Sequence, residues 1–274
     1  MEIHLYTLCW NDADMLPFFF RHYDHVVSRY FIFDDYSNDG SLDLLHSHPN
    51  VEVGSFVRSD PDSFVLSELS IYNACWKRSR GWADWVIVTD IDEHLFHPDL
   101  AALLTRYKAL GITIVPALGY QMISEEFPRS DELLCETRTR GAPWDMYSRL
   151  SLFDPTALTE IDYSVGGHSA NPRGHVIAPT RDELLLLHYK FLGFERTRAR
   201  LQRQRSGLRS KDFEKGWGYQ YCWSEEEFKH TWCEFARNAI DVCADAAFAN
   251  YQIPHWWDPF RLSRVTARSD RQLS

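Results

Sequence analysis

Trp85-Val-Ile-Val-Thr-Asp90-Ile-Asp92-Glu93 is the stretch that decides the fold, because a short apolar run ends abruptly in three carboxylates. Such a β-branched run is typical of a strand that is buried on both faces. Acids inside that strand would be strongly destabilising, so they are expected at its carboxyl end. Side chains alternate along an extended backbone, which predicts that Asp90 and Asp92 project to one side while Ile91 points into the core.

The two aspartates carry like charges close together, and one pKa is expected to rise unless a cation relieves the repulsion. Hard divalent cations such as Mg²⁺ and Mn²⁺ take oxygen ligands and recruit substrate phosphates. The alternative is a strand-end loop whose acids are merely solvated, because acidic loops are common. The rest of the chain has to decide between a metal site and a solvated loop.

The bulk properties indicate a soluble globular protein. The chain has 274 residues, of which 45% are hydrophobic and 25% charged, enough for one large α/β domain or two small ones. A net charge of −10 argues against nucleic-acid binding, although Arg196 to Lys211 carries seven basic residues and no acid. The N-terminus is typical of a strand and not of a signal peptide, and no apolar run is long enough to span a bilayer. We therefore expect a cytoplasmic protein.

The first half alternates between strand and helix patterns. Strands are predicted at Ile3 to Cys9, Tyr30 to Phe33, Val51 to Phe56 and Trp85 to Thr89. Helices are predicted between them, at Asp12 to Val27, Leu42 to His46 and Phe64 to Arg80. This order implies right-handed crossovers and a mainly parallel, Rossmann-like sheet flanked by helices.

The second half is less regular. Further strands are predicted at Ile112 to Pro116, Ser148 to Phe153, His175 to Ala178 and Glu183 to His188. From Phe194 onward the chain reads as helical and basic, and then as rich in tryptophan.

Three acidic loops follow three of the predicted parallel strands. They span Asn11 to Asp14, Asp34 to Asp39, and Asp90 to Glu93. The carboxyl ends of parallel strands share one edge of the sheet, and ligands bind in the crevice there. Residues far apart in sequence are therefore expected to converge on one site.

Three stretches within these regions resemble successive motifs of a known family. They read Asn11-Asp-Ala-Asp-Met-Leu-Pro-Phe, Phe31-Ile-Phe-Asp-Asp-Tyr-Ser-Asn-Asp-Gly-Ser and Val86-Ile-Val-Thr-Asp-Ile-Asp-Glu-His-Leu. Together they resemble family-2-like glycosyltransferases with the GT-A fold, in the branch whose aspartate motif reads Asp-x-Asp-Glu. The resemblance covers about residues 3 to 100. It implies a nucleotide-sugar donor, usually UDP-linked, a Mn²⁺ or Mg²⁺ ion, and a carbohydrate or lipid-linked acceptor.

The resemblance also implies an organisation for the whole chain. Residues 1–110 would form the nucleotide-sugar-binding half of the GT-A domain, and residues 111–193 the acceptor-side half. Residues 194–274 would form a helical, basic and tryptophan-rich C-terminal extension.

Roles for individual residues follow from the same resemblance. Asp34 or Asp35 would hydrogen-bond the nucleoside, with Asn11 lining the same pocket. Asp90 would approach the ribose or the ion, and Asp92 would coordinate the metal that bridges the two phosphates. The alternative for Asp34 and Asp35 is a tight turn with a helix cap.

In this fold class a histidine late in the chain often completes the metal shell. His188 ends an apolar strand and is the expected ligand, while His168, in a glycine-rich loop, would neighbour the donor or acceptor. Lys190 or an arginine of the basic segment would add positive charge in a lid over the diphosphate. The alternative for that segment is a solvated or membrane-facing helix, with exposed tryptophans docking on lipid.

An inverting transfer needs a carboxylate that takes the proton of the acceptor hydroxyl. Here the chain departs from the family pattern, and Glu125, Glu126 and Asp145 are the candidates. Asp145 is preferred because the neighbouring Trp144 would stack on a sugar, although a tryptophan is more often part of the core.

Other classes fit less well. A nucleotidyltransferase usually has a glycine-rich and basic loop after the first strand, whereas the loop here is acidic. A glycosidase needs two carboxylates flanking the bond and no nucleotide-binding crevice. A non-catalytic relative that binds a sugar nucleotide or a carbohydrate is the remaining alternative.

Overall fold

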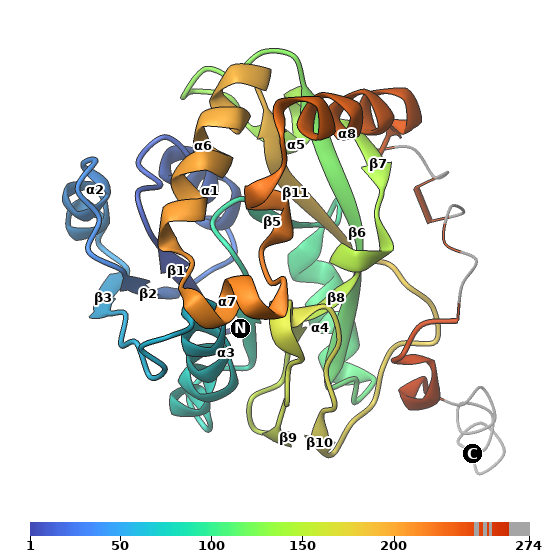
Figure 1. The fold of residues 1–274 in the computed structure, drawn as a ribbon. Helices are drawn as coiled ribbons and strands as arrows, with labels where there is room; N and C mark the ends of the chain where they lie inside the picture. Colours follow the sequence, from blue (N-terminus) through green and yellow to red (C-terminus); the bar gives the residue numbers. More distant parts are fainter. Residues whose placement is uncertain (244–246, 249–250, 252–253, 263–274) are drawn as a thin grey trace, which may run out of the picture.

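A computed structural model describes residues 1–243, 247–248, 251 and 254–262 of the chain. Its centre is a mixed sheet with helices on both faces (Figure 1). Four neighbouring strands at the centre and on one side of this sheet are parallel. In spatial order they are β4 (Trp85–Val88), β1 (Ile3–Cys9), β2 (Arg29–Asp34) and β3 (Val51–Ser55). This arrangement confirms the predicted α/β fold with a mainly parallel central sheet.

The order of these strands defines where a ligand crevice lies. From β1 the chain moves outward through β2 to β3, and then returns to place β4 on the other side of β1. The connections therefore diverge between β1 and β4, which is the topological switch point of the sheet. The loops that follow β1 and β4 are two of the acidic loops, Asn11 to Asp14 and Asp90 to Glu93, that were predicted to meet at this edge.

Strand β4 is buried on both faces, as its composition predicts. Trp85 and Ile87 pack into a core cluster on one face, and Val86 and Val88 pack into a cluster on the other. Ile91, just beyond the strand, also lies in the core and is 2% exposed. A charged side chain would therefore be buried in the core at any position of β4, and the first acids follow the end of the strand.

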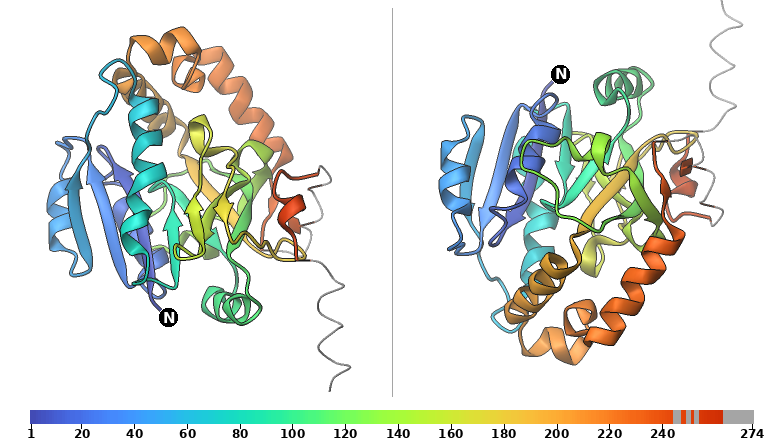
Figure 2. Two further views of the ribbon diagram at one scale, coloured as in Figure 1. Left: turned by 90° about the horizontal axis from the view of Figure 1, so that it is seen from below. Right: turned by 90° about the horizontal axis from the view of Figure 1, so that it is seen from above.

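The helices cover the two faces of the sheet and its carboxyl edge. Helices α1 (Leu16–Tyr23) and α4 (Leu100–Ala109) pack on one face, and α3 (Phe64–Ala74) packs on the other. Two further helices, α6 (Phe194–Gly207) and α7 (Ser210–Lys215), lie on the side of the molecule away from the N-terminus, beyond the carboxyl ends of the parallel strands (Figure 2). The remaining helices are α2 (Ser41–Ser47), α5 (Leu134–Thr137) and α8 (Glu225–Asn238).

Two predicted helices are shorter in the structure. Helix α1 begins at Leu16 because the preceding residues form a hydrogen-bonded turn in which the Asp12 carbonyl accepts the N–H groups of Met15 and Leu16. Helix α3 ends at Ala74, and the next five residues continue as a 3₁₀ helix, Cys75–Ser79.

The later strands extend the sheet with mixed directions. The strands beyond β4 are, in spatial order, β8 (Arg149–Phe153), β6 (Ile114–Ser124), β7 (Arg140–Pro143) and β12 (Ile240–Asp241). Strand β11 (Leu185–Leu192) pairs in parallel with β6 and antiparallel with β5 (Glu93–Phe96). A separate small sheet joins β9 (Leu158–Glu160) to β10 (Arg173–Gly174).

Two expectations for this half need correction. The strand predicted at His175 to Ala178 is wrong, because within it only Ala178 forms an isolated bridge, with Arg261. Strand β5 was not predicted, although it begins at Glu93, directly after the aspartates.

Residues 194–274, predicted to form a C-terminal extension, include α6, α7 and α8, and positions 244–246, 249–250, 252–253 and 263–274 lie outside the described residues. Two tryptophans of this region belong to the core, since Trp232 and Trp257 are only 4% and 1% exposed, while Trp217, Trp223 and Trp256 are partly exposed. Docking of this region on lipid stays a prediction. Within the described residues, no helix combines the length and the apolar character that crossing a bilayer requires.

Candidate functional site

A cavity of about 450 Å³ lies beyond the carboxyl ends of β1 and β4. Its wall combines residues from eight separate stretches of the chain, between Leu8 and Tyr221. The titratable and aromatic members used below are Trp10, Asp12, Glu68, Asp90, Asp92, Trp144, Tyr147, Arg149, His168, His188, Lys190, Arg200, Arg203 and Tyr221. The acidic loops after β1 and β4 therefore converge here as expected, whereas the loop Asp34 to Asp39 does not line the cavity.

Asp92 and His188 face each other inside this cavity. The Oδ1 atom of Asp92 lies 3.6 Å from Nε2 of His188, and both side chains are almost fully buried. Strand pairing fixes the contact, because His188 of β11 stands opposite Glu93 of β5, and the Tyr189 N–H donates to the Asp92 carbonyl at 2.7 Å. The two residues predicted as metal ligands thus face each other, although His188 lies within β11, which continues to Leu192, and does not end the strand as expected.

The imidazole of His188 is held in one orientation by Gln121. The Gln121 amide nitrogen donates to the carbonyls of Met122 and His188, each at 3.0 Å, so its Oε1 atom must face the ring. That oxygen lies 2.9 Å from Nδ1 of His188, which is therefore the protonated nitrogen. Nε2 then presents a lone pair toward Asp92, the arrangement in which a histidine binds a metal ion.

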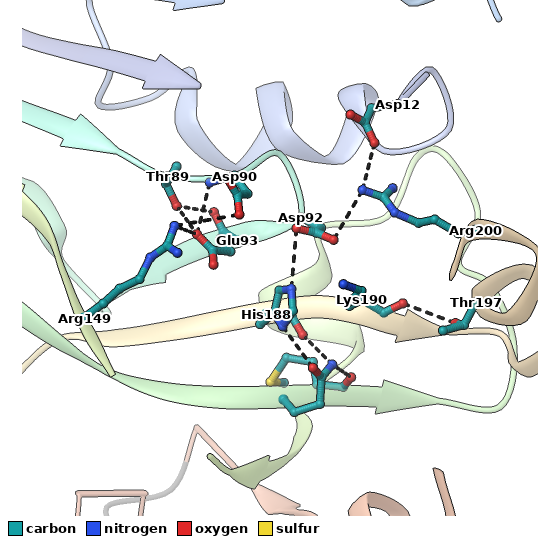
Figure 3. A network of polar contacts seen from close by, with 12 residues as sticks. Asp12, Thr89, Asp90, Asp92, Glu93, Arg149, His188, Lys190, Thr197 and Arg200 are labelled. Atoms are coloured by element: carbon teal, nitrogen blue, oxygen red, sulfur yellow. Dashed lines mark hydrogen bonds and ion pairs between the residues drawn. The ribbon is translucent and has the colours of Figure 1, made fainter. Parts of the chain in front are cut away.

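Arg200 of α6 bridges two acids of the cavity wall. Its Nη2 atom lies 2.8 Å from Oδ1 of Asp12 and 3.4 Å from Oδ2 of Asp92 (Figure 3). None of the three side chains is more than 9% exposed. The loop after β1, the loop after β4 and the basic helix therefore meet at one buried cation.

The charge state of Asp92 follows from these neighbours. Burial works against the ionised form, but the positive charges of His188, Arg200 and Lys190 outweigh it and hold the pKa of Asp92 well below its usual range. Burial also lowers the pKa of His188, although the nearby Asp92 carboxylate opposes the shift. Arg200 is the permanent charge among these neighbours, so it favours the ionised form of Asp92 whatever the protonation state of His188.

Lys190 lies two residues beyond His188 on β11 and lines the same cavity. Its ammonium lies 4.6 Å from the centre of the Tyr221 ring and 3.5 Å from the Tyr221 hydroxyl. Among the described residues no carboxylate forms an ion pair with it, and burial lowers the pKa of Lys190 to about 8. A buried lysine of this kind is poised to pair with an anion that enters the cavity.

Helix α6 turns one side of its basic surface inward. Arg196 pairs with Asp14 at 2.8 Å, and Arg203 donates to the Asn11 carbonyl at 3.1 Å. With Arg200 these arginines follow an i, i+4, i+7 spacing, which places them on one helix face. The fully solvated alternative for the basic segment is therefore wrong for this face of the helix.

Asp90 and Glu93 have separate tasks around the turn after β4. Asp90 lines the cavity and accepts a hydrogen bond from the Tyr72 hydroxyl at 2.6 Å, with Arg149 3.9 Å away. Glu93 is fully buried, pairs with Arg149, and accepts the Asp90 N–H at 3.0 Å and the Thr89 hydroxyl at 2.9 Å. Glu93, to which the sequence assigned no role, therefore fixes the conformation of the turn that carries the aspartates.

The three residues expected to bind the nucleoside are not part of the cavity wall. Asn11 accepts the Asn38 N–H at 2.8 Å, and Asp34 accepts the Ser37 N–H at 3.0 Å, which is the turn role considered as the alternative. Asp35 forms a 2.6 Å ion pair with Arg58. The contact of Asp34 or Asp35 with a nucleobase stays a prediction.

The three candidates for the catalytic base also lie outside the cavity wall. Glu125 and Glu126 are exposed beyond the end of β6. Asp145 is exposed and directed toward His255, 3.7 Å away, although its neighbour Trp144 does line the cavity. Adjacency in sequence did not fix the direction in which the Asp145 side chain points.

His168 does line the cavity, as the neighbour that was expected. Its Nδ1 atom lies 2.6 Å from the carbonyl of Met146, and burial lowers its pKa.

Sequence reasoning missed Glu68 and Arg149. Glu68 is the single acid of the otherwise uncharged helix α3, and this isolation was a usable signal. Arg149 begins the apolar strand β8, so its charge at a strand end was comparable to that of Asp90.

The metal site predicted at Asp90, Asp92 and His188 is not a complete ligand set. Within the described part of the chain, no group of three or more His, Cys, Asp or Glu side chains is placed to hold a metal ion. Asp92 and His188 supply one oxygen and one nitrogen ligand, and further ligands would have to come from water or from a bound diphosphate.

No protein-family model and no curated protein sequence matches the chain. Among solved structures, S. aureus TarS 1-349 in complex with UDP is similar with a TM-score of 0.35 and 11% identity, over 57% of this chain and 48% of that one. S. aureus TarS 1-349 in complex with UDP-GlcNAc is similar with a TM-score of 0.35 and 9% identity, over 74% of this chain and 65% of that one. A further S. aureus TarS structure is similar with a TM-score of 0.34 and 12% identity, over 57% of this chain and 29% of that one. The chain therefore spans less than two thirds of each, and its function has to be inferred from the geometry of its own site.

Proposed function

We propose that this protein is a glycosyltransferase that moves a sugar from a nucleoside-diphosphate donor to a hydroxyl acceptor, with a divalent cation assisting. One observation carries the proposal. At the switch point of the sheet, a single cavity joins the ionised Asp92 and His188 to the buried cations Lys190 and Arg200. A diphosphate needs such a combination of cations and metal-ligating atoms.

The cationic wall suits the leaving group of this reaction. Negative charge grows on the diphosphate as the bond to the anomeric carbon breaks, and fixed cations stabilise that charge. Lys190 has no carboxylate partner among the described residues, so its charge is available to the ligand. Arg203 lines the same wall and adds a second donor from helix α6.

Asp92 and His188 are the residues that would hold Mn²⁺ or Mg²⁺. The Nδ1–H of His188 is committed to Gln121, which leaves Nε2 free as a ligand beside the Asp92 carboxylate. Bound there, the ion would neutralise charge on the diphosphate and orient the donor. Asp90, held by Tyr72, would approach the ribose.

The remaining wall is suited to sugars. Trp10, Trp144, Tyr147 and Tyr221 line the cavity with aromatic rings, on which the apolar face of a sugar stacks. A carbohydrate or a lipid-linked saccharide is therefore the acceptor class that we propose, with inversion at the anomeric carbon.

The test is isothermal titration calorimetry with UDP, with and without Mn²⁺. Asp92→Asn and His188→Gln are expected to weaken Mn²⁺-dependent binding on the order of 10- to 100-fold, because each removes one ligand of the ion. Asp43→Asn, an exposed acid on α2, is the matched control and should leave binding unchanged.

Metal-independent binding of UDP that is equal in wild type and Asp92→Asn would overturn the metal-assisted site. A panel of nucleotide sugars, with release of the nucleoside diphosphate as readout, then identifies the donor. Binding without turnover of every donor would instead indicate a non-catalytic nucleotide-sugar-binding protein.

A further inference from the structure

Glu68 lines the cavity, and within the described residues its carboxylate oxygens have no hydrogen-bond or ion-pair partner. It lies in α3 and is half-buried, and it lines the main cavity and also a small recess beside it.

The other acids of the cavity wall each have a partner. Asp12 and Asp92 share Arg200, at 2.8 Å and 3.4 Å. Asp90 accepts the Tyr72 hydroxyl at 2.6 Å. Within the described cavity wall, the α3 carboxylate is therefore the one able to receive a proton without first giving up a protein partner.

The recess beside Glu68 has the size of a single small group. Its volume is about 30 Å³, and its wall includes Arg149, Gly166 and Gly167. A recess of this volume holds one water molecule or one hydroxyl. A side chain is not tolerated at Gly166, since a Cβ atom there would come within 2.6 Å of His168 Nε2.

The surroundings of Glu68 make it a stronger proton acceptor than an exposed glutamate. Burial, reinforced by the negative charge of Asp90 and opposed by Arg149, raises the pKa of Glu68 to about 8. A general base works best when its pKa lies near the working pH.

We propose that Glu68 is the catalytic base of the transfer, an inference that rests on the proposed function. The acceptor hydroxyl occupies the recess, and its oxygen forms the new bond to the anomeric carbon. The bond from that carbon to the donor diphosphate breaks, and its electron pair leaves with the diphosphate. The hydroxyl proton passes to the Glu68 carboxylate, so that charge and atoms balance.

The experiment compares Glu68→Gln with wild type in two assays. The first measures UDP binding by calorimetry, and the second measures release of nucleoside diphosphate from the donor that wild type uses. Glutamine keeps the shape of glutamate but cannot take the proton, so turnover should fall at least ~100-fold while UDP affinity stays within about 2-fold. Glu214→Gln, an exposed acid on α7, is the matched control and should retain full turnover.

Three outcomes are distinguishable. If wild type neither binds UDP nor consumes any donor, the proposed function fails. If wild type is active and Glu68→Gln keeps more than about a tenth of its turnover, only the role of Glu68 is overturned, since base catalysis contributes more than that. Glu68→Asp, which keeps a carboxylate, should retain more turnover than Glu68→Gln, and equal losses in both variants would also count against the base.

Discussion

Replacing Arg200 by methionine tests the buried cation at the centre of the site. The variant keeps most of the apolar stem and removes the charge that Asp12 and Asp92 share at 2.8 Å and 3.4 Å. Two carboxylates, each less than a tenth exposed, would then be left without that partner. Removing one member of a buried ion pair typically costs about 3–5 kcal/mol.

Urea unfolding followed by circular dichroism at pH 7 measures this loss. For a chain of this size the same loss corresponds to a fall in Tm of roughly 10 °C. Arg198→Met is the matched control on the same helix, because Arg198 pairs with the largely exposed Glu195 and should change stability by less than about 0.5 kcal/mol. Added Mn²⁺ should restore part of the stability of Arg200→Met, because a divalent cation beside Asp92 replaces the missing charge. A loss below about 1 kcal/mol would refute the view that Arg200 neutralises these buried acids.

Three further predictions concern the scaffold. Burial lowers the pKa of His22 from 6.5 to about 4, so the unfolded chain takes up a proton before the folded chain as the pH falls. The free energy of unfolding should therefore decrease by about 3 kcal/mol between pH 6.5 and pH 4. In urea titrations His22→Phe should remove about one proton from the pH dependence of stability, whereas His46→Phe, at an exposed position, should leave it unchanged. Gly119→Ala would place a Cβ atom 2.3 Å from the backbone of Tyr147, so we expect the free energy of unfolding to fall by about 1–3 kcal/mol and UDP binding to weaken. A variant as stable as wild type would contradict this close packing. Asp212 is fully buried and accepts two backbone N–H groups at 2.9 Å, at the starts of α3 and α7, so Asp212→Asn should lose about 1–3 kcal/mol in the same urea assay.

The sequence predicted the parts of the site that depend on strand burial. Asp92 was found because it follows an apolar run that excludes charged side chains until strand β4 ends. His188 was chosen by the same reasoning, although strand β11 continues past it to Leu192. The strand at His175 to Ala178 failed because a short mixed segment carries no burial pattern that distinguishes a strand from a loop.

The catalytic base could not be predicted in the same way. The choice of Asp145 relied on a neighbouring tryptophan, yet adjacent side chains at a bend point in different directions, and only Trp144 reaches the cavity. Glu68 lies on a helix, where its contact with the cavity depends on how α3 packs against the sheet. That packing is a tertiary property, which a local pattern does not contain.

The bridge formed by Arg200 has a consequence for synthesis on the ribosome. Asp12 and Asp92 emerge long before the helix that supplies their shared cation, because the chain is made from its N-terminus. Until that helix arrives, Asp12 and Asp92 at the edge of the nascent sheet lack their shared cation, and water has to solvate the charge that Arg200 later neutralises. Closure of the cavity is therefore a late event in folding, and chains stalled before residue 200 should expose this edge to proteases and to metal ions.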